Sequence, residues 1–184
     1  MAALITLFAL LATSCSPSSP ECDPQQRVEE IREVVARNAD LVERVYVTPR
    51  GYEDGEYIVP RWDLLTGDSL LALPNPADVD TSQLVEIGYK DNIMRLGQMY
   101  GAETYRASYE ILDSLSAEVI RVYRLTGAGE MTSHVNTSGT VKFTICGNHT
   151  VVYRADTTNT SSGWNHIRGR SQEVAKHWYM YTDE

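Results

Sequence analysis

Four histidines are the side chains of this sequence best suited to acid–base or metal chemistry. They are His134, His149, His166 and His177. No two of them have the spacing that places two metal ligands on one helix face or one strand face. We therefore expect neither a metal site nor a cofactor, and we assign no catalytic residue. A general acid–base arrangement of His149, Asp156 and His166 stays open, and it would make the protein a hydrolase.

The segment from Thr157 to Arg170 carries the one basic, aromatic cluster of an acidic chain. Its 14 residues are rich in Thr, Asn, Ser and Gly, which is typical of a long surface loop. The cluster consists of Trp164, His166, Arg168 and Arg170. Exposed aromatic and arginine side chains are enriched at binding hot spots, so we expect a binding site here. The alternative is that Trp164 folds back onto a sheet while the arginines are solvated.

Cys15 stands at the end of an apolar N-terminal segment. The run from Ala2 to Ala12 is shorter than the roughly 20 residues of a membrane-spanning helix, and small residues lead from it into Cys15. This pattern resembles a bacterial lipobox. The resemblance implies that residues 1–14 are a signal peptide and that the Cys15 thiol receives a diacylglycerol. Residues 15–22 would be the lipidated cysteine and a polar spacer. A short buried element and a cleaved but unlipidated signal remain alternatives.

Two further cysteines, Cys22 and Cys146, form an even pair once Cys15 carries lipid. An exported protein lies in a compartment that permits disulfides, so the two could be bonded. They could equally be two free thiols, with Cys146 buried as a small hydrophobic residue.

Composition narrows the class of protein and of partner. Of the 184 residues, 42% are hydrophobic and 22% are charged, as in soluble globular domains. The formal net charge of -9 would repel a phosphate backbone, so we expect no nucleic-acid partner. At this length we expect one globular domain, over residues 23–184.

The start of that domain has the signature of an amphipathic helix. Asp23 can cap free amides, and Pro24 fits a first turn that needs no donor. Apolar residues then recur at helical spacing from Val28 to Val45, which predicts a helix of about 16 to 20 residues. The helix should pack on a sheet, because the sequence that follows is rich in Thr, Tyr, Val and Ile.

Several later segments have the pattern of strands. Residues 141–146 and 150–154 flank a short polar turn, which predicts a hairpin, and a strand should end the chain at residues 173–181. Alternation at residues 85–89 and apolar residues at 94–100, with a turn between them, suggest two more strands. These segments predict an α+β fold in which one N-terminal helix packs on a mostly antiparallel meander, either open or curled toward a barrel.

Residues 103–125 fit two patterns. Apolar and polar side chains alternate strictly from Thr104 to Ile111, which favours a strand and is our main interpretation. Apolar residues also recur three and four apart as far as Val122, and Gly127 could end a helix. A second helix over 103–125 would give a curved-sheet fold resembling cystatin-like or nuclear-transport-factor-like domains.

The order of a helix and tyrosine-rich turns is similar to poorly characterised bacterial envelope lipoproteins built from β-meanders. The similarity rests on Gly51–Gly55, Ile87–Asn92 and Tyr100–Tyr105. It implies a noncatalytic, lipid-anchored protein that faces the periplasm or the cell exterior. Such a protein would act as a binding or accessory protein for an envelope partner or a small apolar ligand. A structural role in the envelope and a hydrolase using the His149 region are the alternatives.

Overall fold

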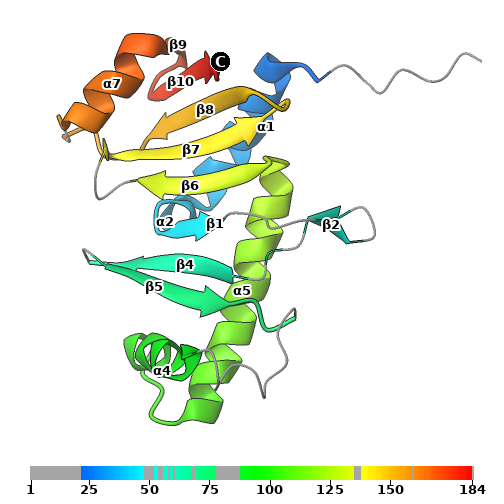
Figure 1. Cartoon of the computed structure of the whole chain (residues 1–184), viewed down its shortest axis with the longest axis vertical. Coiled ribbons are helices and arrows are strands. Elements are labelled where there is room, and N and C mark those ends of the chain that lie inside the picture. The colour runs from blue at the N-terminus through cyan, green and yellow to red at the C-terminus, as the bar shows by residue number, and fades with distance from the viewer. Residues whose placement is uncertain are drawn as a thin grey trace, which may run out of the picture.

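The computed structural model describes most of the chain after the first cysteines (Figure 1). The described residues are 22–47, 52–53, 56–57, 59, 61–67, 69–77, 88–134, 138–158 and 160–183. The helices are α1 (Pro24–Arg37), α2 (Ala39–Val42), α4 (Tyr89–Met99), α5 (Tyr105–Thr126) and α7 (Ser162–Arg170). The strands are β1 (Val45–Val47), β2 (Tyr52–Glu53), β3 (Glu56–Tyr57), β4 (Arg61–Thr66), β5 (Ser69–Pro74), β6 (Glu130–His134), β7 (Thr140–Ile145), β8 (His149–Arg154), β9 (Gln172–Ala175) and β10 (Trp178–Thr182).

Eight strands form one open antiparallel sheet in the order β5-β4-β1-β6-β7-β8-β10-β9, which confirms the predicted α+β class. β5 and β9 are its edges, so the sheet does not close into a barrel. β1 lies between the β4–β5 hairpin and the strands that begin with β6. It pairs with β4 over three residues but with β6 only at Val47 and Met131.

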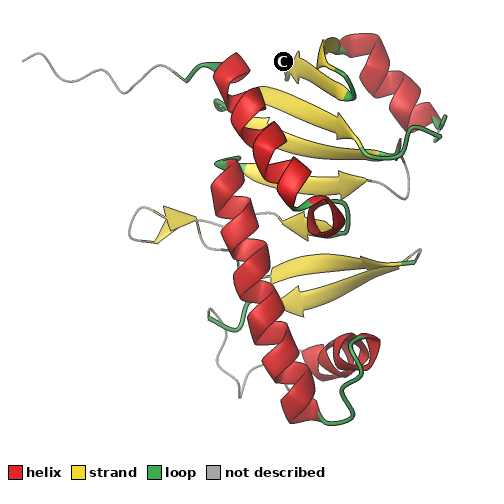
Figure 2. Cartoon of the chain, turned by 180° about the vertical axis from the view of Figure 1, so that it is seen from behind, coloured by secondary structure: helices red, strands yellow, loops and turns green. Residues whose placement is uncertain are grey.

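The helices lie on both faces of this sheet. α1 and α5 cross one face, as Figure 2 shows from behind, and most of the core lies between them and the strands. α7 packs on the opposite face over β8 and β10, where Val152 and Tyr181 contact its Trp164 and Ile167. None of the helices in the described ranges combines the length and the hydrophobicity needed to cross a membrane.

α1 forms as its sequence predicts but is shorter. The Asp23 side chain accepts a hydrogen bond from the Gln25 amide at 2.9 Å, and Pro24 is the first helical residue. Val28, Ile31 and Val35 are buried against the sheet and α5. The helix ends at Arg37 after 14 residues, because the chain turns at Asn38 into the four-residue α2.

α5 corrects the preferred strand interpretation of residues 104–111, and the helical alternative for 103–125 is right. The Thr104 hydroxyl accepts from the Ala107 amide, and Gly127 takes the left-handed φ of 56° that ends the helix. One face of this helix is buried over its whole length, including Leu112, Val119 and Val122. The indole of Trp62 in β4 donates to Ser116 at 3.0 Å and fixes α5 to the sheet.

α4 corrects a second prediction, because residues 94–99 belong to a helix that begins at Tyr89, with Tyr100 at its end, and not to a strand. The prediction for residues 85–87 lies outside the described residues. α4 packs closely on α5, where Gly97 faces Ser108. A β-carbon at Gly97 would lie 1.8 Å from the Ser108 hydroxyl and 2.9 Å from the Ser108 Cα, so this contact requires glycine.

Candidate functional site

The predicted binding loop at 157–170 is largely a helix, and its tryptophan is a core residue. Ser161 caps α7 by accepting a hydrogen bond from the Trp164 amide at 3.3 Å. The Trp164 side chain is only 3% exposed and meets the ring of Tyr179 edge-on at 4.9 Å. The expectation that Trp164 is an exposed binding anchor is therefore wrong. Trp164 is buried because it packs on the apolar patch of β8 and β10.

The other members of the predicted cluster separate into structural and exposed side chains. The guanidinium of Arg170 lies 4.0 Å from the centre of the Tyr181 ring, and that of Arg154 lies 4.3 Å from the Trp164 ring. These cations cover aromatic faces, a contact of about 0.5 to 2 kcal/mol. His166 and Arg168 are exposed on α7. Trp164 and Arg170, two of the four residues in the predicted cluster, therefore attach α7 to the sheet.

The histidines are not gathered into a catalytic group. His149 begins β8 and Asp156 follows the end of that strand, so at roughly 3.3 Å per residue they lie about 20 Å apart. The acid–base arrangement of His149, Asp156 and His166 is therefore not assembled. Within the described ranges no three histidine, cysteine or acidic side chains lie where they could hold a metal ion together.

Charged side chains of β6 and β7 gather on the face of the sheet away from α1 and α5. Glu130 and His134 share this face of β6, with Lys142 beside them on β7. Burial, and next the positive charge of Lys142, lower the pKa of His134. Burial, and next Arg170, lower the pKa of Lys142 against the opposing effects of Asp183 and Glu130. The three side chains interact electrostatically, and both cations lose part of their preference for the charged state.

An open groove with an unusual lining lies between the β4–β5 hairpin, the start of β1 and α4. Its volume is about 630 Å³. We call it the hairpin–helix groove, and it is lined by Arg44, Leu65, Thr66, Gly67, Leu71, Arg95, Gln98 and Met99. Arg44 and Arg95 form no ion pair with any residue that the structure describes. The groove thus combines two arginines that have no ion pair in the described chain with a lining that is partly apolar.

Two smaller grooves follow α1 along its boundary with β9 and β10. One, of about 420 Å³, lies beside Asp23, Gln26 and Glu173, and the other, of about 360 Å³, lies beside Ala36 and Trp178. Glu29 borders both. Their charged groups are mostly acidic, and Arg32 is already bound to Glu29 at 2.6 Å. These grooves resemble the rest of this acidic surface.

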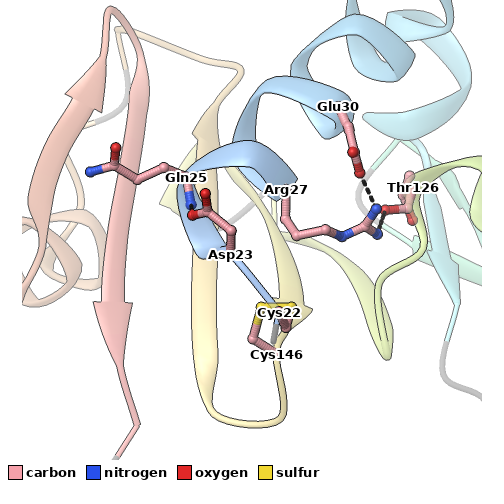
Figure 3. The surroundings of a disulfide bond; sticks show 7 residues. All are labelled: Cys22, Asp23, Gln25, Arg27, Glu30, Thr126 and Cys146. Carbon is pink, nitrogen blue, oxygen red and sulfur yellow. Dashed lines mark hydrogen bonds and ion pairs between the residues drawn. A yellow bond between two sulfur atoms is a disulfide. The ribbon is translucent and has the colours of Figure 1, made fainter. Parts of the chain in front are cut away.

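A disulfide joins the start of the domain to the turn between β7 and β8 (Figure 3). The sequence left the pairing of Cys22 and Cys146 open, and the structure bonds them with a Cα separation of 5.6 Å. Arg27 strengthens the same end of α1, because its guanidinium contacts Glu30 and donates to the Thr126 carbonyl at 2.7 Å. The first turn of α1 is thus fixed covalently to the sheet and by hydrogen bonding to the end of α5.

Sequence reasoning missed the hairpin–helix groove because its parts are far apart in the chain. Arg44 precedes β1, and Arg95 lies in a helix that the sequence pattern assigned to strands. The sequence carried no signal for it, because Asp40 and Asp91 stand four residues before Arg44 and Arg95, at the spacing of a helical ion pair, and neither ion pair forms. Comparison with protein-family models, curated proteins and solved structures found no match to this chain.

Proposed function

We propose that this protein is an exported lipoprotein of the bacterial cell envelope, anchored through Cys15, that acts as a noncatalytic binding or accessory protein. The observation that carries the proposal is the Cys22–Cys146 disulfide directly after the lipobox-like segment. Disulfides persist in the periplasm and outside cells but are rare in the reducing cytosol. The bond supports export independently of the N-terminal pattern.

The covalent geometry also suits an anchor at Cys15. Seven residue steps separate Cys15 from Cys22, and an extended chain of that length reaches at most about 25 Å. A lipid on Cys15 would keep the disulfide end of the domain near the bilayer. The bond would also transfer any pull on the tether to β7 and β8, so that α1 does not carry it alone.

A binding role is supported by the hairpin–helix groove. Most of its lining residues lie on the β4–β5 hairpin and on α4, and these elements are at the end of the molecule opposite the start of α1 (Figure 1). A protein tethered through Cys15 would therefore present this groove away from its anchor. Small-molecule sites commonly have volumes of about 300 to 1,000 Å³, and the groove is within that range.

Metabolic labelling with an alkyne-tagged fatty acid tests the anchor. In bacteria that produce the full chain, we expect label on the wild-type protein and a mature N-terminus at Cys15 by intact mass. Cys15→Ala should lose the label. Cys22→Ala is the matched control, because it removes a cysteine and the disulfide but should keep the label. An unlabelled wild type, or a label that survives Cys15→Ala, would contradict the proposal.

A further inference from the structure

The two arginines of the hairpin–helix groove differ from six other arginines of this protein in their pairing. Six other arginines are bound to an acidic side chain nearby: Arg27, Arg32, Arg37, Arg61, Arg106 and Arg121. Arg44 and Arg95 have no such partner in the described part of the chain, although acidic residues outnumber basic ones by 25 to 16. A guanidinium without a protein anion is available to bind an external one. Its planar donors match a carboxylate with two parallel hydrogen bonds.

Apolar surface adjoins these charges. Leu71 is buried at the floor of the groove, and Met99 lines it while remaining 46% exposed. The exposed Met99 side chain next to Leu71 leaves apolar surface in water that an apolar group can cover. The groove therefore offers positive charge and hydrophobic contact together.

We propose that the hairpin–helix groove binds a single-chain anionic amphiphile, namely a free fatty acid, with the carboxylate between Arg44 and Arg95 and the acyl chain over Leu71 and Met99. The groove's volume and open mouth suit a small molecule whose tail stays partly exposed. Its distance from the tethered end of the domain favours a free ligand over the lipid surface of the anchoring membrane (Figure 1). This inference names the ligand of the proposed binding function and rests on it.

Binding is measured with laurate as the probe, below its critical micelle concentration. The protein is the full chain carrying Cys15→Ala and purified without detergent, so that its own lipid cannot occupy the groove. Carbon-13 labels on the methionine methyl groups report the location. We expect laurate to shift the Met99 signal and to leave that of Met180, in β10 near the other edge of the sheet, unchanged.

Variants separate the two parts of the site. Arg44→Gln combined with Arg95→Gln should raise the Kd for laurate at least about tenfold, because both bidentate partners are lost. Met99→Gln should weaken binding several-fold through the acyl chain. Arg168→Gln is the matched control, since it removes the same charge from an exposed arginine on α7, and it should change the Kd less than about twofold.

Ligands with other head groups complete the test. Dodecyltrimethylammonium and dodecyl maltoside should bind at least about tenfold more weakly than laurate, because neither offers an anion to the arginines. The inference is overturned if all three amphiphiles bind alike, if Arg168→Gln weakens binding as much as the groove variants do, or if only anionic vesicles shift the Met99 signal. A failure of this kind would leave fatty-acid labelling of Cys15 unaffected, so the ligand and the anchor are tested separately.

Discussion

Removal of the Cys22–Cys146 bond should lower stability more than any other small change near the N-terminus. The bond joins residues separated by 124 positions, and the chain-entropy relation gives about 5 kcal/mol for a loop of that length. This is an upper value, because compact unfolded chains already lose part of that entropy. We expect Cys22→Ala/Cys146→Ala to lose about 3 to 5 kcal/mol in the free energy of unfolding. Helix content should persist, since Val28, Ile31 and Val35 stay buried.

Urea denaturation followed by circular dichroism measures both quantities that this reasoning needs. The midpoint should fall while the denaturant slope rises, because the unfolded chain without its cross-link exposes more surface. Cys22→Ala/Cys146→Gly is the matched control for the backbone. Cys146 holds a left-handed φ of 49°, so glycine should recover part of the loss and leave the contribution of the cross-link. A loss below about 1 kcal/mol with an unchanged slope would refute the argument.

Three further changes test the packing and the titration of the domain. Gly97→Ala should lose about 1 to 3 kcal/mol in urea denaturation because its methyl group meets Ser108, whereas Gly169→Ala, which meets nothing within 4 Å, should be neutral or stabilising. Trp164→Ala should lower the free energy of unfolding by about 3 to 5 kcal/mol, because the side chain is buried. A loss below about 1 kcal/mol would contradict a core position and support the surface role expected from the sequence. Burial lowers the pKa of His134 below its ordinary 6.5, so the unfolded chain binds more protons than the folded chain as the pH falls through that value, and stability declines. His134→Gln should therefore lose less stability than the wild type between about pH 7.5 and 5.5, and a loss equal to that of the wild type would contradict the assignment.

The elements that local chemistry determines could be predicted from the sequence. The cap at Asp23 and the proline after it define the start of α1 without help from the rest of the chain. The hairpin of β7 and β8 follows from two apolar segments around the turn at residues 146–148. Both predictions needed only neighbours within a few residues. The class of the fold followed from them.

The elements that depend on distant contacts could not be predicted. The apolar residues of 105–111 fit both a strand period of two and a helical period of about 3.6. The helix forms because α5 packs on the sheet and Trp62 of that sheet donates a hydrogen bond to it. The same holds for Trp164, because a polar, glycine-containing segment reads as a loop until the apolar surface of β8 and β10 is known. The groove lined by Arg44 and Arg95 depends likewise on a distant contact, because Arg95 lies on α4 and α4 packs on α5.

β1 has a consequence for how the domain opens. This strand of three residues is the sole described link between the β4–β5 ladder and the strands from β6 onward, and toward β6 it has one register pair where β7 and β8 have six. Subglobal opening follows the boundaries with the fewest contacts. Amide hydrogens at Val47 and Met131 should therefore exchange before those inside either ladder. α5, which runs past both ladders (Figure 2), would then set how far the two parts can separate before the whole domain unfolds.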